Sequence, residues 1–344
     1  MAKARGYFAG FSLKSDVGLS SDDVVLFKTV SQQPELFESV GMIALPTVSD
    51  HRAGNARKAR IHVVYYKSQS DYLLLTRPLS ANLEEVVSFA SSLRGSSSDL
   101  KIFASLASDR ITGFERLIRA FGGSVDGYEI DLGLMFHLYG MRRGFESFAI
   151  DLLEELVRRA DRPLLAKVSP GIPMSEDFLK LVVETGISGL VFSPHVAYSI
   201  GSELFRAHSP LLSRVFSHAW ARLSASLSLS TAYITDVPPA LLDELDPARA
   251  FDVLLLDVAA LLGYVKIREG AGAPMPLRWI EAAEGAYPTL DWEDRECAYA
   301  CPFAAFAGAG KGGLLAAREE RCDFCGLCLS ACKTAKLTRV LTPE

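Results

Sequence analysis

Eight short runs of β-branched or apolar residues alternate with longer segments of helical periodicity between residues 8 and 265. Runs this short form strands, and a helix between successive strands lets them lie parallel in one sheet. Eight such units predict an α/β fold, a (β/α)8 TIM barrel whose active site forms at the carboxyl ends of its strands. The alternative is a doubly wound open sheet, but no first turn carries its G-x-G-x-x-G fingerprint. The predicted strands begin at Phe8, Met42, Lys101, Gly127, Pro163, Gly189, Ser230 and Phe251.

The chain is expected to divide into a barrel over residues 1–268 and a smaller unit over residues 286–344. The glycine- and proline-rich segment REGAGAPMP, residues 268–276, separates them as a linker. Two alternating runs, HVVYYKS and DYLLLTR, predict a hairpin inserted after the second strand. The clearest helices are predicted from Phe145 to Ala160 and from Ser175 to Thr185, where Ser175 is a good N-cap.

Composition limits the classes of partner. The formal net charge of −5 gives no basis for a nucleic-acid footprint. The longest apolar stretch, residues 251–265, is interrupted by two aspartates and is shorter than the roughly 20 residues that span a bilayer. The N-terminus MAKARGYFAG lacks the apolar core of a secretory signal. We therefore expect a cytoplasmic protein that binds neither nucleic acid nor membrane.

All six cysteines lie after position 296. Disulfides usually join distant parts of secreted domains, so this distribution favours thiolate ligands. Zinc sites typically use two separated C-x-x-C pairs, whereas four of these cysteines follow the C-x2-C-x2-C-x3-C spacing that holds a [4Fe-4S] cluster. These four are Cys322, Cys325, Cys328 and Cys332.

A second, incomplete copy of this motif precedes the first. It reads D-x-x-D-x-x-C-x3-C-P, with Asp291, Asp294, Cys297 and Cys301 in its four ligand positions. The two segments resemble a bacterial two-cluster ferredoxin, in which the fourth cysteine of each run serves the other cluster. The resemblance implies one complete site, made of Cys301, Cys322, Cys325 and Cys328. The other site would have only Cys297 and Cys332 as thiolates, and we expect it to be empty, with an altered or three-iron cluster as the alternative.

The barrel resembles the flavin-dependent dihydroorotate and dihydropyrimidine dehydrogenase superfamily. The matching segments are GMIALPTVSDHRAGNARKAR from Gly41, YEIDLGLMFHLYG from Tyr128, RPLLAKVSPG from Arg162 and TGISGLVFS from Thr185. The resemblance implies FMN as cofactor and places Lys167 against the flavin ring. It also implies roles for Thr47 and Asn55, and leaves Gly201 as a possible phosphate contact.

Several departures weaken this expectation. Pro46 stands where the family has a second flavin-contacting lysine, and Asp131, Phe136 and Pro194 replace asparagines that bind the pyrimidine. A site without those amides discriminates against dihydroorotate by orders of magnitude, so we do not expect that substrate. The glycines of the phosphate loops are also missing, because the seventh and eighth strands end in Asp236 and Asp257.

Three barrel residues are candidates for chemistry. Lys167 could polarise a flavin or a substrate carbonyl, or it could instead pair with Glu129 or Asp131 on the adjacent strand. His137 and Tyr139 follow the fourth strand, where the family carries its catalytic base, although surface or packing roles are the alternative. His195 after the sixth strand is a similar case with less support.

These features predict an iron-sulfur oxidoreductase that passes electrons between a barrel site, with or without FMN, and an external redox carrier or partner subunit. The barrel site would take a small-molecule substrate, and a homo-oligomer is possible. The alternatives are a non-catalytic iron-sulfur scaffold or electron-transfer subunit with a degenerate barrel, and a purely structural cluster that stabilises the C-terminal unit.

Overall fold

The computed structural model describes most of the first 257 residues and parts of the C-terminal segment. The described residues are 6–20, 39–50, 61–68, 71–76, 82–96, 99–139, 144–170, 172, 175–200, 203–237, 250–257, 286–294, 298, 301, 305–306, 314–318, 322, 328, 332 and 334–339.

Eight parallel strands close into a barrel. Each is hydrogen-bonded to two neighbours, and the pairing of β4 with both β3 and β8 completes the ring. In order around the barrel the strands are β3 (Val17–Ser20), β4 (Met42–Ala44), β8 (Lys101–Ala107), β9 (Gly127–Asp131), β10 (Leu164–Val168), β11 (Gly189–Phe192), β14 (Ser230–Thr235) and β15 (Val253–Asp257). The short strand β5 (Val48–Ser49) runs beside the end of β8. The predicted (β/α)8 barrel is thus confirmed.

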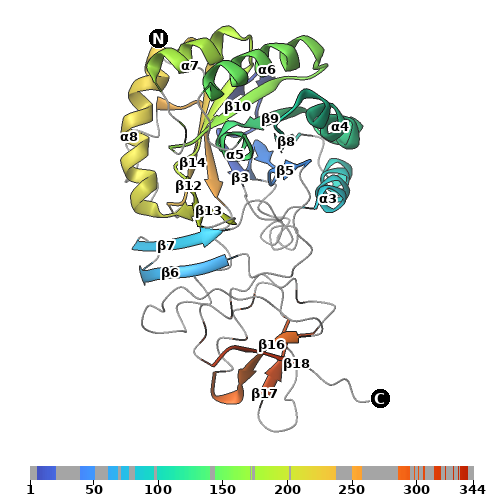
Figure 1. Cartoon of the computed structure of the whole chain (residues 1–344), viewed down its shortest axis with the longest axis vertical. Helices are drawn as coiled ribbons and strands as arrows, with labels where there is room; N and C mark the ends of the chain where they lie inside the picture. Colours follow the sequence, from blue (N-terminus) through green and yellow to red (C-terminus); the bar gives the residue numbers. More distant parts are fainter. Residues whose placement is uncertain are drawn as a thin grey trace.

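Helices cover the outside of this ring (Figure 1). They are α3 (Leu83–Ser96), α4 (Ile111–Phe121), the 3-10 turn η2 (Gly122–Ser124), α5 (Leu132–Leu138), α6 (Phe145–Arg159), α7 (Glu176–Glu184) and α8 (Pro210–Ser226). The predicted helices at 145–160 and 175–185 correspond to α6 and α7. The Ser175 side chain accepts the Phe178 N–H at 3.0 Å, as expected of an N-cap.

The prediction for the first strand was wrong. The run that begins at Phe8 forms an antiparallel hairpin, β1 (Tyr7–Phe8) and β2 (Phe11–Ser12), and the first barrel strand is β3. The hairpin turns at Ala9 and Gly10, both with positive φ. Its side chains pack inside the amino-terminal end of the barrel, where Phe8 shares a buried cluster with Phe103 and Leu165. The apolar run that begins at Phe8 therefore fills one end of the barrel and forms no strand of its wall.

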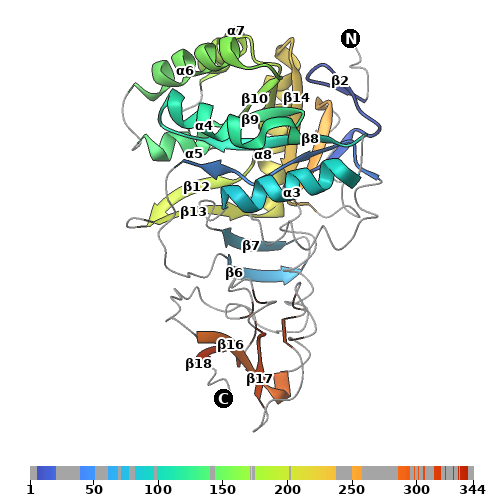
Figure 2. The same ribbon diagram turned by 90° about the vertical axis from the view of Figure 1, so that its right-hand side faces the viewer.

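A second sheet of four antiparallel strands lies over the opposite end of the barrel. Its order is β12 (Val196–Ile200), β13 (Glu203–His208), β7 (Asp71–Thr76) and β6 (Ile61–Ser68). The predicted hairpin corresponds to β6 and β7, whereas β12 and β13 form a second hairpin that the sequence did not predict. Both views place this sheet between the barrel and the C-terminal segment (Figures 1 and 2).

The described C-terminal residues form a small antiparallel sheet, β17 (Leu314–Ala316), β16 (Ala286–Asp291) and β18 (Lys336–Arg339), followed after β16 by the 3-10 turn η5 (Trp292–Asp294). The predicted linker, 268–276, lies outside the described residues. Among the described helices, none is long and apolar enough to cross a membrane.

Candidate functional site

Charged side chains project into the barrel near the carboxyl ends of its strands. Alternate residues of a strand face the same side, and Leu165 of β10 belongs to the apolar cluster inside the barrel. Lys167, two residues later, therefore also points inward, and its register partner on β9 is Asp131. Lys167 and Asp131 are 3% and 1% exposed, so both charges must be compensated within the protein.

Lys167 is held by two carboxylates and two hydroxyls. Its ammonium nitrogen lies 3.0 Å from Glu129 Oε1 and 3.0 Å from Asp131 Oδ2. It also donates to Thr47 Oγ1 at 3.1 Å and to Ser105 Oγ at 3.2 Å. The structure therefore pairs this lysine with both carboxylates that the sequence offered as the alternative to a flavin contact.

Arg206 adds a second cation to this group. It lies on β13 of the covering sheet, is 4% exposed, and donates to Asp131 Oδ2. The other carboxylate oxygen of Asp131 accepts the Leu134 N–H at 2.9 Å and caps α5. We call Lys167, Arg206, Glu129 and Asp131 the lysine cluster; it holds two permanent positive charges and two carboxylates.

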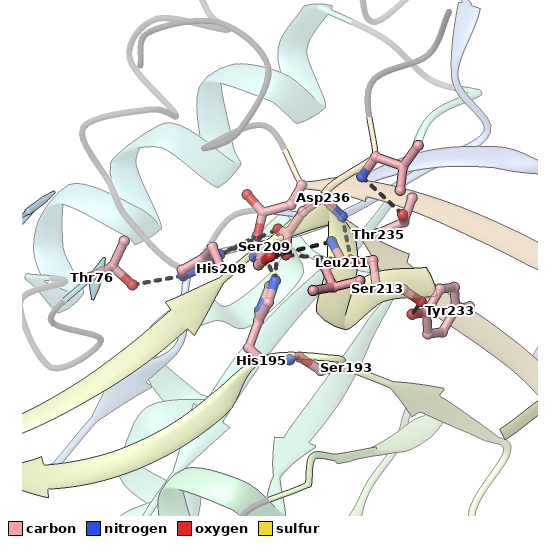
Figure 3. A network of polar contacts seen from close by, with 12 residues as sticks. Thr76, Ser193, His195, His208, Ser209, Leu211, Ser213, Tyr233, Thr235 and Asp236 are labelled. Atoms are coloured by element: carbon pink, nitrogen blue, oxygen red, sulfur yellow. Dashed lines mark hydrogen bonds and ion pairs between the residues drawn. The ribbon is translucent and has the colours of Figure 1, made fainter. Parts of the chain in front are cut away.

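A second buried group lies at the ends of β11, β14 and β15. His195, His208, Asp236 and Asp257 are all at most 1% exposed. His195 Nε2 is 3.0 Å from Asp236 Oδ1 and 3.4 Å from Asp257 Oδ2. His208 Nδ1 is 3.5 Å from Asp236 Oδ1 and 3.4 Å from Asp257 Oδ2. We call these four residues the histidine cluster; Figure 3 shows two of its side chains, His195 and His208, directed toward Asp236.

Hydrogen bonds fix the orientation of the histidine cluster. Asp236 Oδ2 accepts the Ser209 N–H at 2.8 Å at the start of α8 and the Ser213 hydroxyl at 3.4 Å. His208 Nε2 is 2.8 Å from the Thr76 hydroxyl on β7 (Figure 3). Asp236 and His208 are thus each held by a partner on the side away from the centre of the cluster.

Burial and the neighbouring carboxylates act in opposite directions on the histidine cluster. Burial alone would lower the pKa of His208, but hydrogen bonds and charge from Asp236 and Asp257 outweigh it and raise this pKa to about 10. Burial would likewise raise the pKa of Asp236, but the charge and hydrogen bonds of His195 and His208 hold it below its usual range. Without another cation present, the cluster retains protons at neutral pH.

The ends of β14 and β15 do not form the phosphate cradle that the flavoenzyme resemblance implies. Such a cradle offers backbone N–H groups to an anion. Here the buried carboxylates of Asp236 and Asp257 occupy these strand ends, and Asp236 already takes the Ser209 N–H. A phosphate would find these strand ends filled by buried carboxylates that are already paired with His195 and His208, so these described residues do not fit FMN.

The other residues predicted for the barrel site are dispersed. Thr47 belongs with the lysine cluster, since its hydroxyl is 2.8 Å from Ser105 Oγ and donates to Asp131 at 3.0 Å. Tyr139 stacks on Phe148 with ring centroids 4.5 Å apart, and both rings pack against the main hydrophobic core. Asn55 and Gly201 lie outside the described residues.

His137 is on α5 beside the lysine cluster. Both of its ring nitrogens are buried and have no hydrogen-bond partner among the described residues. Its pKa is lowered by burial and by the positive charge of Arg206, against a smaller opposing effect of Asp131. A neutral imidazole with an available lone pair is therefore present at this side of the barrel.

Sequence reasoning did not find Arg206 and His208. They lie two residues apart on β13 and therefore face the same side, toward the barrel. The only local signal is the alternation of Phe205, Arg206, Ala207 and His208, in which Phe205 and Ala207 join an apolar cluster on the other face. Nothing local to this run indicates that its cations meet carboxylates from β9, β14 and β15.

The described cysteines fall into two groups. Cys301 and Cys322 pack against the same pair of buried residues, Ala305 and Ala317, and neither Cys301, Cys322 nor Cys328 forms a disulfide. Cys332, in contrast, is disulfide-bonded, and its N–H donates to the Cys328 carbonyl at 2.9 Å. Cys297 and Cys325 lie outside the described residues.

The two aspartates that replace cysteines in the first motif bind protein groups. Asp294 accepts the Thr334 N–H at 3.1 Å and its hydroxyl at 3.2 Å. Asp291 is 3.9 Å from the Lys336 ammonium, and its side chain is 45% exposed. Both contacts link the region around η5 to the chain that follows Cys332.

Part of this chain is similar in sequence to a known protein. No family model matches the chain. A stretch of 78 residues is 36% identical to the catalytic subunit of dihydroorotate dehydrogenase B (NAD(+)) from Methanopyrus kandleri, covering 22% of this chain and 24% of that protein. The matched region is thus about a quarter of the relative's length.

Two solved structures align with much of this chain at low similarity. The flavin-binding domain of baker's yeast flavocytochrome b2 aligns over 75% of this chain and 61% of its own, at 13% identity and a TM-score of 0.41. A tryptophan synthase complex from Pyrococcus furiosus aligns over 74% and 90%, at 15% identity and a TM-score of 0.40. Likeness at this level carries no information about activity.

Proposed function

We propose that this chain is an iron-sulfur electron-transfer protein of the oxidoreductase class. A single [4Fe-4S] cluster, held by Cys301, Cys322, Cys325 and Cys328, would accept and release one electron at a time. The barrel would serve as the scaffold that presents this unit to a redox carrier or partner subunit. The short match to a dihydroorotate dehydrogenase subunit agrees with the oxidoreductase class.

The observation that carries this proposal is the division among the described cysteines. Cys301 and Cys322 pack on the same pair of alanines, and neither forms a disulfide. Asp294 is used by Thr334, which supports a single cluster and an empty second site. Both features favour Cys301 over Cys332 as the fourth ligand.

The mouth of the barrel supports a scaffold rather than a flavin site. Its buried charges are matched by other charges of the same chain, in the lysine cluster and in the histidine cluster. The flavin-contacting role expected of Lys167 would require breaking two ion pairs with buried carboxylates, which is costly. No step through FMN is therefore proposed.

The test is the cofactor content of protein purified without oxygen. We expect iron near four atoms per chain, the visible absorption of a [4Fe-4S] cluster, and no FMN released on denaturation. Cys301→Ala should abolish the cluster absorption, while the matched variant Cys332→Ala should keep it. Retention of the cluster in Cys301→Ala together with its loss in Cys332→Ala would refute the ligand assignment.

A second candidate, a catalytic barrel that oxidises a small molecule, is favoured by one observation. The two ring nitrogens of His137 and the Glu129 Oε2 atom are buried without hydrogen-bond partners among the described residues. Polar atoms of this kind normally find a partner, and a substrate or cofactor group could supply it. Release of about one FMN per chain in the same experiment would select this candidate.

A further inference from the structure

We propose that His195, His208, Asp236 and Asp257 bind one divalent transition-metal ion of the zinc class, and that this ion fastens the four-stranded sheet to the barrel. The proposal is independent of the iron-sulfur function, because it uses no cysteine and lies inside the barrel mouth. It rests on the geometry of the histidine cluster, on the groups that surround it, and on its charge.

The nitrogen-to-oxygen separations in the cluster match those of a tetrahedral metal site. One potential ligand atom from each residue lies within 4.8 Å of the other three. The four nitrogen-to-oxygen separations are 3.0, 3.4, 3.5 and 3.4 Å. A tetrahedral zinc ion with bonds of about 2.0–2.1 Å keeps its ligand atoms about 3.3–3.4 Å apart. These four separations therefore differ from the tetrahedral values by at most a few tenths of an ångström.

The outer atoms of the ligands are held as they are around metal ions in proteins. A metal-binding histidine usually engages its second ring nitrogen in a hydrogen bond, and metal-binding carboxylates are themselves hydrogen-bonded. His208 would bind through Nδ1 while Nε2 contacts the Thr76 hydroxyl at 2.8 Å. Asp236 would bind through Oδ1 while Oδ2 accepts the Ser209 N–H at 2.8 Å. These bonds orient both ligands before any ion arrives.

Charge also favours a metal over protons. Two buried carboxylates need two positive charges, which either two imidazolium rings or one divalent ion can supply. The rings of His195 and His208 have centroids only 4.0 Å apart, so two imidazolium cations would repel each other strongly at this depth. One ion between neutral rings balances the same carboxylates without that repulsion.

The donor set selects the class of ion. Two imidazole nitrogens with two carboxylate oxygens suit zinc and neighbouring first-row ions, whereas calcium and magnesium prefer six or more oxygen ligands. Four protein ligands leave no position for a substrate, and closed sites of this kind are structural. The ligands come from distant segments, namely the end of β11, the covering strand β13, and the ends of β14 and β15.

Cobalt substitution tests the proposal on the full-length protein with its iron-sulfur cluster intact. Chelator-treated protein should bind one equivalent of Co²⁺ and develop the visible bands of a tetrahedral ion. Nitrogen and oxygen ligands give no thiolate-to-cobalt charge-transfer band, so the spectrum separates this site from the C-terminal cysteines. His208→Gln and Asp257→Asn should remove the visible bands.

Matched variants give the controls. His218 and Asp177 are exposed residues on α8 and α7, so His218→Gln and Asp177→Asn should leave cobalt binding unchanged. His208→Cys should keep the site and add a charge-transfer band to the difference spectrum, a gain that mere misfolding cannot produce. The proposal is overturned if wild-type protein shows no tetrahedral cobalt spectrum, or if His208→Gln and His208→Cys both reproduce the wild-type spectrum.

Discussion

The two buried charge clusters at the barrel mouth differ in whether their positive charges are permanent. Each takes one residue from the same face of β13, Arg206 in the lysine cluster and His208 in the histidine cluster. Lysine and arginine have ordinary pKa values well above physiological pH, and both cations of the first cluster are paired with carboxylates. The histidines of the second can exchange their protons with solvent or for a metal ion.

This difference assigns the clusters different tasks. Two cations balance the two carboxylates of the lysine cluster whatever the conditions, so it holds β13 on the barrel unconditionally. The histidine cluster holds the same strand only while its histidines carry protons or an ion. The covering sheet is therefore attached to the barrel at two neighbouring points of β13. The attachment through Arg206 is constant, and the attachment through His208 is conditional.

Removing one cation from the lysine cluster should have the largest effect. Lys167→Met would leave Glu129 and Asp131 buried with one cation fewer, and breaking a buried pair in this way typically costs about 3–5 kcal/mol. We expect a loss of this size in the free energy of unfolding, measured with denaturant. The control is Lys180→Met on the surface of α7, where the lysine pairs with Glu176 and an effect below about 0.5 kcal/mol is expected. Equal losses in both variants would show that the buried lysine contributes no more to stability than a surface lysine does.

The stability that the histidine cluster contributes should depend on pH. In metal-free protein the pKa of His208 is raised to about 10, from about 6.5 in the unfolded chain. Above pH 7 the folded state therefore holds a proton that the unfolded state lacks, and stability should fall by about 2–3 kcal/mol between pH 7 and pH 9.

Zinc should remove this slope if it replaces the protons, because the ligands are then neutral imidazoles in the folded state. The measurement is denaturant unfolding at a series of pH values with and without one equivalent of zinc. A metal-free protein whose stability is flat from pH 7 to pH 9 would contradict the assignment of the exchangeable charge to His208.

Much of the lysine cluster could be predicted from the sequence. Strands such as β9 and β10 stand out as apolar runs, and parallel neighbours carry their strand-end residues to the same edge, which brings Lys167 near Glu129 and Asp131. The first strand was missed because β3 has only four residues, one of which is Gly18. So short a run shows no recognisable strand pattern in the sequence. The hairpin that begins at Phe8 has a stronger apolar pattern, but it fills the barrel instead of forming its wall.

The histidine cluster could not be predicted, because it depends on where β13 lies in the folded protein. Asp236 and Asp257 were recognised only as obstacles to a phosphate, and His195 as an isolated candidate. Their common partner His208 lies on β13. This strand pairs with β7, which is more than a hundred residues earlier in the chain. Such long-range pairing has no local signature, so the cluster exists only at the level of the tertiary structure.

The smallest predicted effect concerns a third histidine, His137, whose surroundings are the reverse of those of His208. Its pKa is lowered by burial and by Arg206, so the folded state resists protonation more than the unfolded chain does. Stability should therefore decline as the pH falls from about 6.5, the unfolded value, toward the lower folded value. His137→Gln should reduce the difference in unfolding free energy between pH 7 and pH 5, an effect limited by the partial exposure of the ring. Tyr139→Phe, which keeps the stacking on Phe148 and adds no titrating group, should leave that difference unchanged. If His137→Gln keeps the wild-type acid sensitivity, burial and the charge of Arg206 do not lower the pKa of His137 in the folded protein.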